Sequence, residues 1–248
     1  MHDHTLPVGG WPKLLPETEA RLRPTRKEQW IRLLFPARCA LCDAVLPQDQ
    51  SLLVCDPCRC VLVPAEPVWM PCPDWPELDA WYGAFPYAGG VEQAIRRMKY
   101  NGCPGHADVL GFLLAAAAAG MASDCGIVPV PMHPRKERAR GYNQAVLIAE
   151  EVGKEWNMDV FPFVVRKTGD TAAQNGKGRQ RRREVLAGTF SPCTGGEAPI
   201  RPDILLIDDV VTTGSTLRAC ASAIRDAYGL VGVPAESVRI RALTVAYA

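Results

Sequence analysis

The chain has 248 residues, of which 48% are hydrophobic and 22% charged, and these proportions are typical of a folded globular protein. Lys and Arg number 28 against 27 Asp and Glu, so the net charge of +1 excludes a generally basic coat for nucleic acid or anionic membrane and leaves only a local basic patch open. The longest apolar run, residues 109–122, is shorter than the roughly 20 residues that a membrane span needs, and residues 1–26 lack the apolar stretch of a secretory signal. We therefore expect a soluble, cytoplasmic protein without membrane insertion.

Four of the ten cysteines form a doubled motif, Cys39-x2-Cys42 followed after twelve residues by Cys55-x2-Cys58. A reducing cytosol argues against a disulfide framework. Each tight pair presents two thiolates, and two pairs make a tetrahedral four-cysteine site, so the spacing predicts structural zinc (Zn²⁺). Incidental buried thiols and two redox pairs are the alternatives, and Cys60 is a second candidate for the ligand role of Cys58.

Three regions differ in composition. Residues 1–29 form a polar, proline-rich tail, and residues 30–80 carry the cysteines among short apolar stretches. A segment of this kind buries little core, so metal binding would supply its folding free energy, on the order of 10 kcal/mol. Residues 81–248 alternate apolar strand-like runs with helical patterns, which predicts an α/β domain with a parallel, Rossmann-like sheet.

The expected elements of that domain follow from apolar periodicity. In chain order they are a strand at 84–87, helices at 91–100 and 107–119, a strand at 127–131, a helix at 143–156, strands at 160–165 and 203–207, a helix at 217–228 and a strand at 238–247. The run at 203–207 is almost wholly apolar, as in a strand buried on both faces of a parallel sheet. Right-handed crossovers then bring ligand-binding loops to the carboxyl ends of the strands.

The strongest functional motif follows that apolar strand, where residues 204–216 read ILLIDDVVTTGST and a helix begins. A small, hydroxyl-rich loop that opens a helix exposes backbone N–H groups and the positive helix end, which together cradle a phosphate. Gly214 allows a close approach of the backbone. The adjacent acids Asp208 and Asp209 would repel a phosphate unless they hold sugar hydroxyls, bridged by magnesium, on the same ligand. The alternative is a helix capped by Thr or Ser after a buried strand, which explains one hydroxyl but not the cluster.

DDVVTTGST resembles the phosphoribosyl pyrophosphate (PRPP) loop of type I phosphoribosyltransferases. Together with the doubled CxxC motif, VPVPMHPRKERARGYNQA at 128–145 and the final RALTVAYA, it is similar to the ComF family. The likeness covers about residues 30–248. It implies a type I phosphoribosyltransferase fold with a small N-terminal zinc module, and a link to natural competence and DNA uptake.

The resemblance also implies roles for individual residues. Asp208 and Asp209 would bind the ribose 2- and 3-hydroxyls, and the loop that follows would hold the 5-phosphate. The PRPP-binding set is Asp208, Asp209, Val210, Val211, Thr212, Thr213, Gly214, Ser215 and Thr216. The pyrophosphate would face a loop with Met132, His133 and Arg135. The catalytic set is Asp208, Asp209, Arg135 and Arg140.

A basic stretch at 166–183 would be the flexible loop that closes over the ligand, with seven Lys or Arg against one acid. Where the family pattern has Asn three residues after an Arg, this chain has Val185 after Arg182. Pyrophosphate displacement at the anomeric carbon needs no covalent nucleophile, so catalysis would come from positioning, from Mg²⁺ on the leaving group and from nearby cations. His133 has the chemistry of an acid or base, but between two prolines a structural role is favoured.

Two hypotheses follow. In the first the protein is an enzyme, a phosphoribosyltransferase that binds PRPP with Mg²⁺ and transfers the phosphoribosyl group to an unknown acceptor. In the second it is a non-catalytic competence accessory that binds single-stranded DNA or a competence helicase partner, with the PRPP site as sensor or scaffold. Stacking aromatics would support the second. The candidates Trp69, Trp75, Trp81 and Tyr82 lie near acids, however, and packing between module and domain is favoured for them.

Overall fold

The core of the protein is a five-stranded sheet with the order β1-β2-β7-β6-β3. The structure, a computed structural model, describes residues 24–169, 189–193 and 202–248. The strands of the sheet are β1 (Met70–Pro71), β2 (Ala80–Pro86), β3 (Gly126–Pro129), β6 (Asp203–Val211) and β7 (Arg239–Tyr247). Every neighbouring pair is parallel except β1–β2. The predicted α/β class with a mainly parallel sheet is confirmed, and it is consistent with a phosphoribosyltransferase-like fold.

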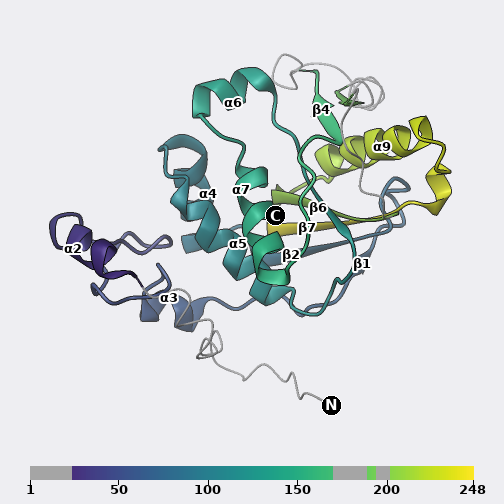
Figure 1. Cartoon of the computed structure of the whole chain (residues 1–248). Helices are drawn as coiled ribbons and strands as arrows, with labels where there is room; N and C mark the ends of the chain where they lie inside the picture. Colours follow the sequence, from purple (N-terminus) through teal and green to yellow (C-terminus); the bar gives the residue numbers. More distant parts are fainter. Residues whose placement is uncertain (1–23, 170–188, 194–201) are drawn as a thin grey trace, which may run out of the picture.

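Helices cover both faces of this sheet (Figure 1). The helices of the domain are α4 (Gly89–Tyr100), α5 (Gly105–Ala117), α6 (Pro134–Arg140), α7 (Gln144–Trp156) and α9 (Ser215–Leu230), with a 3-10 turn, η2 (Ala235–Ser237), before β7. Buried residues of α4, α5 and α7 share one apolar cluster with one face of β6, and α9 shares a second cluster with the other face. A short antiparallel pair, β4 (Val165–Lys167) and β5 (Phe190–Pro192), lies against α9.

Strand β6 is buried on both faces because its side chains alternate between the two layers. Ile204 and Leu206 belong to the cluster with α9, and Leu205 and Ile207 belong to the cluster with α4, α5 and α7. The same alternation governs the acids that come next in the strand, and it decides which layer each carboxyl group meets.

The cysteine-rich region contains the helices α2 (Arg26–Leu34) and α3 (Asp56–Val61), and it lies at one end of the molecule (Figure 1). Its buried residues Leu41, Leu52 and Val54 belong to the same apolar cluster as α4 and α5. Strand β1, at residues 70–71, is an edge strand of the main sheet. The division of the chain at residues 29 and 80 stays a prediction.

Several of the expected elements differ from the structure in their bounds; the strand expected at 84–87, for example, begins four residues earlier, at Ala80. The predicted strand at 160–165 is wrong: Val160 makes a single bridge to Ile127, a turn follows, and β4 begins at Val165. Pro162 lies in that turn, and proline lacks the N–H that a strand ladder requires. Strand β6, expected to end at residue 207, continues to Val211 because β7 pairs with it along that whole length.

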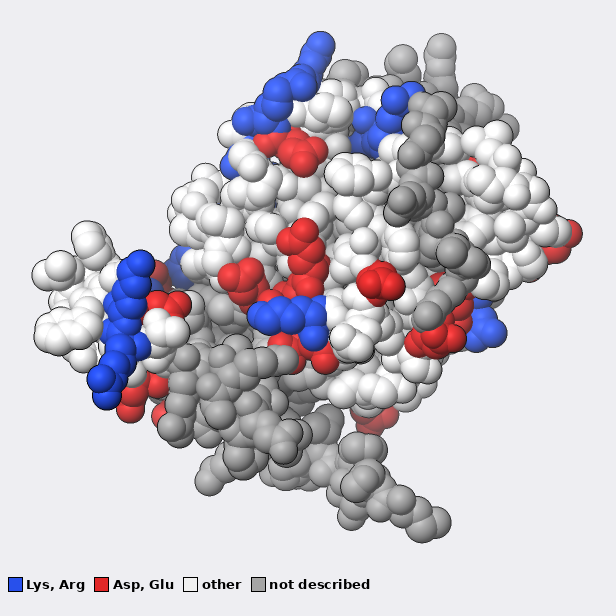
Figure 2. All heavy atoms as spheres, in the orientation of Figure 1, with Lys and Arg blue, Asp and Glu red and all other residues white. Residues whose placement is uncertain are grey.

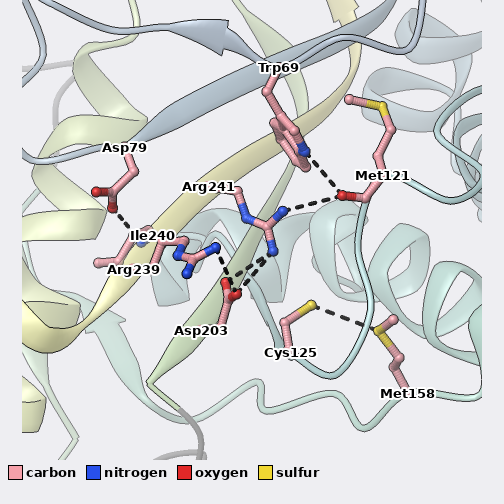
Figure 3. A network of polar contacts seen from close by, with 9 residues as sticks. All are labelled: Trp69, Asp79, Met121, Cys125, Met158, Asp203, Arg239, Ile240 and Arg241. Atoms are coloured by element: carbon pink, nitrogen blue, oxygen red, sulfur yellow. Dashed lines mark hydrogen bonds and ion pairs between the residues drawn. The ribbon is translucent and has the colours of Figure 1, made fainter.

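A polar network at the amino ends of β6 and β7 ties the chain that leaves the cysteine region to the sheet (Figure 3). Arg241 donates to both carboxylate oxygens of Asp203, at 3.1 and 3.2 Å, and to the carbonyl of Met121. Its guanidinium lies 4.9 Å from the ring centre of Trp69, whose indole N–H also donates to Met121. Arg239 reaches Asp203 at 3.7 Å from a more exposed position. The network lies at the end of the sheet opposite the acid pair.

We expect Arg241→Lys to lower the free energy of unfolding by about 1.5–3 kcal/mol, because lysine keeps the charge but loses the planar, two-pronged contact and the stacking. Urea unfolding would measure the loss. Arg239→Lys is the matched control: its side chain is 64% exposed, and an exposed pair contributes less than about 1 kcal/mol. Equal losses in the two variants would contradict this assignment.

None of the helices in the described parts of the chain is both long and apolar enough to cross a membrane.

Candidate functional site

The four cysteines of the doubled motif lie together. Their sulfur atoms are all within 4.8 Å of one another, and those of Cys42 and Cys55 are 3.5 Å apart. Four sulfurs about 2.3 Å from one zinc ion would be about 3.8 Å from each other, so this group has the size of a tetrahedral zinc site. Cys60 is exposed and does not belong to the group, which contains Cys58. The arrangement fits structural zinc with the predicted ligands.

The thiols of this group have unequal environments. Burial raises the pKa of Cys58 and of Cys55 above the ordinary thiol range, whereas a backbone hydrogen bond from Ala44 lowers that of Cys42 to about 7. Metal binding requires thiolates and releases their protons, so zinc affinity is expected to rise with pH.

The first cysteine turn is docked on α4. A Cβ added to Gly90 would lie 2.8 Å from the Cβ of Leu41, so the helix accepts the turn only because glycine stands there. Further along α4, the guanidinium of Arg97 donates to the carbonyl of Ala40 at 3.3 Å. The turn between Cys39 and Cys42 is therefore in contact with α4, a helix of the main domain.

The phosphate-loop candidates and the acid pair lie at the carboxyl edge of the sheet. The backbone N–H of Val130, after β3, donates to the carbonyl of Ile207 at 2.8 Å, so the loop from Pro131 begins beside the acids. The last residue, Ala248, donates to Val211 at 3.0 Å. Three strands thus bring their carboxyl ends to one place, as parallel α/β sheets do at their ligand sites.

The loop from Thr212 to Thr216 turns directly into α9. Gly214 is the N-cap with φ +69, and its lack of a side chain means that no side chain of the cap accepts from the first turn. The alternative of a Thr or Ser cap is therefore wrong. Thr212 and Thr213 are exposed, and the Thr213 and Ser215 hydroxyls are 3.1 Å apart. The helix end offers backbone N–H groups and hydroxyls to an anion.

Trp75 supports this loop from the side. A Cβ added to Gly214 would meet the indole carbons of Trp75 at 2.4 Å, so the ring packs on the backbone of the loop. The segment that carries Trp75 is held along α9 by two ion pairs, Glu77 with Arg218 at 2.8 Å and Asp79 with Arg225 at 3.2 Å. The loop is therefore braced by a segment that precedes β2.

The acids Asp208 and Asp209 lie within β6, so their carboxyl groups face different layers. Asp209 is 3% exposed and forms an ion pair of 2.8 Å with Lys99 of α4. Asp208 faces the α9 layer and is half-buried, and its Oδ1 accepts from the backbone N–H of Asp209. Burial and the neighbouring Asp209 raise the pKa of Asp208 to about 7, against the opposing effect of Lys99 and Lys167.

Lys99 is the residue that the sequence analysis missed. It lies in the last turn of an expected amphipathic helix, where a basic residue is ordinary. Nothing in the local pattern distinguishes it from Arg96 or Arg97 on the same helix. Only the packing of α4 beside β6 reveals the contact with Asp209.

The predicted pyrophosphate loop lies at the carboxyl edge of the sheet, and one of its residues, His133, has a structural function. His133 is the N-cap of α6, and its Nδ1 accepts from the backbone N–H of Arg135 at 3.2 Å. Met132 is half-buried, and Arg135 is exposed. Arg140 donates to the side-chain carbonyl of Gln144. The basic stretch at 166–183 lies outside the described residues beyond Gly169.

The aromatic candidates for nucleic-acid stacking are packed. Tyr82 is 1% exposed, and Trp75 and Trp81 lie 6.0 Å apart between ring centres and pack against the α9 cluster. Trp69 covers Arg241. All four side chains make packing contacts, with Tyr82 buried and the three tryptophans half-buried, while the packing of a separate module onto the domain stays a prediction.

The chain is similar in sequence to proteins named for competence and for DNA utilization. Over 100 residues the chain is 34% identical to competence protein F of Haemophilus influenzae, an alignment of 40% of this chain that spans only 43% of that protein. It is 27% identical to the DNA utilization protein YhgH of Escherichia coli K12 over 197 residues, which cover 74% of this chain and 82% of YhgH. The YhgH of Salmonella typhimurium is 26% identical with the same coverage. No protein-family model matches the chain.

Proposed function

We propose that this protein binds PRPP with Mg²⁺ at the carboxyl edge of its sheet. The premise is its similarity to competence protein F and YhgH, which identifies the chain as a ComF family protein. Those names link the family to competence and DNA utilization. The observation that carries this proposal is the combination at the end of β6: an acid pair followed at once by a hydroxyl-rich loop and a helix whose N-cap, Gly214, has no side chain. An anion at the loop and hydroxyl groups at the acids are complementary to the two ends of a sugar phosphate.

The site divides the ligand between its parts. The 5-phosphate would accept from the backbone N–H groups of α9's first turn and from the hydroxyls of Thr212 and Thr213. The ribose hydroxyls would donate to Asp208, the more exposed acid of the pair. The pyrophosphate would lie toward Arg135 at the start of α6, where the positive charge would stabilise a leaving group.

Transfer would proceed at the anomeric carbon. An acceptor would form a bond to the anomeric carbon while the bond between that carbon and the pyrophosphate oxygen breaks. The pyrophosphate would leave with the electron pair of the broken bond. We assign the chain's residues to binding and orienting the sugar phosphate, and Mg²⁺, which would enter with the substrate, would neutralise charge on the leaving group. The four-cysteine site would have a structural function, away from the acid pair.

We expect Asp208→Asn to weaken PRPP binding about 10- to 100-fold, because the amide replaces charge-assisted hydrogen bonds of about 1.5–3 kcal/mol with neutral ones. Calorimetric titration of the zinc-loaded protein with PRPP and Mg²⁺ measures the loss. Asp226→Asn, which removes an exposed acid of α9, should bind as the wild type does. The double variant with Asp209→Asn should lose binding altogether. Absence of binding by the wild type would contradict the proposal.

A second candidate is a DNA-handling accessory, and the surface of α2 favours it. This helix buries none of its residues; Trp30, which is 72% exposed, lies one turn after Arg26 and Lys27, and Phe35, the C-cap at the other end, is 74% exposed. Figure 2 shows a strip of basic side chains over the end of the molecule that carries α2, with acidic side chains next to it, whereas mostly acidic side chains lie over the middle of this face. Stacking and basic groups together suit single-stranded nucleic acid.

The two candidates predict different measurements. Pyrophosphate release from PRPP on addition of nucleobases or amines would support the enzyme. Binding of a single-stranded oligonucleotide that weakens steeply with salt, without turnover, would support the accessory, because phosphate contacts release counterions. PRPP binding is compatible with both.

A further inference from the structure

Lys99 occupies a position that neither the motif nor the proposed roles explain. Its side chain is 22% exposed, and its ammonium lies 2.8 Å from Oδ2 of Asp209, whose side chain is 5% exposed. Burial opposes the charge of Lys99, but the nearby Asp209 more than offsets it and raises the pKa of the lysine. The Lys99 ammonium therefore lies between α4 and β6, where its ion-pair partner is Asp209 of the acid pair.

The helix that carries Lys99 is held near both ends. Near its start, Gly90 packs on Leu41 of the first cysteine turn. Near its end, the hydroxyl of Tyr142 donates to the carbonyl of Met98, the residue before Lys99. Two separate segments therefore hold α4 where the ammonium meets Asp209.

We propose that Lys99 is the positioning residue of the acid pair: it engages Asp209 in a buried ion pair and leaves Asp208 as the carboxyl group that meets the hydroxyls of the ligand. The different roles of the two acids follow from the strand, because consecutive residues of β6 face opposite layers. Of the two acids, Asp209 is the one that faces α4. The part that concerns the ligand rests on the proposed PRPP binding; the part that concerns the pair does not.

The charged and titratable groups around Asp208 give this division a pH dependence. They are Asp209 on β6, Lys99 on α4, Lys167 on β4 and the thiol of Cys220 on α9, while Tyr87 acts on Lys99. Burial raises the pKa of Asp208 to about 7. Below that pH the acid is protonated and accepts hydrogen bonds weakly, so sugar-phosphate binding should strengthen as the pH rises through 7.

The decisive experiment needs no ligand. The titration of Asp208 is followed by carbon NMR of aspartate-labelled protein, in the wild type and in Lys99→Met, Lys99→Arg and Arg96→Met. We expect Lys99→Met to move the midpoint upward by about one pH unit or more, and Lys99→Arg to restore it. Arg96→Met, which removes an exposed cation of the same helix, should leave it unchanged. An unshifted midpoint in Lys99→Met would overturn the proposal.

Lys99→Met strands Asp209 as a buried charge and can prevent folding. In that case the double variant with Asp209→Asn, which has neither charge, should fold, and its Asp208 should titrate below the wild-type midpoint because the anionic neighbour is gone. A double variant that titrates as the wild type does would also overturn the proposal.

Calorimetry with PRPP and Mg²⁺ then tests the ligand part. The wild type should bind about tenfold more tightly for each pH unit gained below the midpoint, with the same profile in Lys99→Arg. Failure of every variant to bind PRPP would reject the proposed function, whereas the NMR titration would still decide the assignment of Lys99.

Discussion

Replacement of Cys58 by serine is expected to abolish stoichiometric zinc binding and to remove most of the stability of the cysteine region. A structural zinc site supplies on the order of 10 kcal/mol of folding free energy, and a serine hydroxyl does not replace a thiolate ligand. Cys39, Leu41 and Val54 are at most 2% exposed and share the apolar cluster of α4 and α5. The loss should therefore extend from the metal group to α4.

Zinc content and thermal unfolding measure the effect. Cys60→Ser is the matched control, because Cys60 lies two residues further along, is exposed and is outside the group of four. It should keep the metal and the wild-type melting temperature. Retention of one zinc per chain by Cys58→Ser, or its loss by Cys60→Ser, would show that the ligand set is different.

Gly214→Ala should cost the protein about 2–5 kcal/mol and disturb the anion-binding loop. Two effects add: the left-handed backbone at φ +69 costs a residue with a Cβ about 1–2 kcal/mol, and overpacking costs a further 1–3 kcal/mol or so. The overpacking arises because the new methyl group would lie 2.4 Å from the ring of Trp75. Either the ring or the loop must move.

Chemical denaturation separates the two effects with a control glycine. Gly232 has φ +81 and nothing within 4 Å of an added Cβ, so Gly232→Ala should show the backbone cost alone. Combining Gly214→Ala with Trp75→Leu removes the collision and should recover part of the loss. If Gly214→Ala and Gly232→Ala cost the same, Trp75 does not brace the loop.

Local sequence was sufficient for the features whose determinants lie within a few residues. The spacing of Cys39, Cys42, Cys55 and Cys58 places two tight turns that need only to face each other, and the fold brings their sulfurs together. The apolar run before Asp208 is a strand buried on both faces, and a helix follows the motif as expected, although it begins at Ser215, two residues before the expected start. These features depend on periodicity and backbone preferences, which short segments carry.

Tertiary structure alone decided the features that join distant segments. The extension of β6 through Asp209 depends on β7, which pairs with it, and the ion pair of Asp209 depends on where α4 is docked. The contact of Trp75 with Gly214 likewise joins residues far apart in the chain. No short segment of the sequence carries such contacts, since they are selected by the packing of layers whose interfaces form only when the whole domain folds.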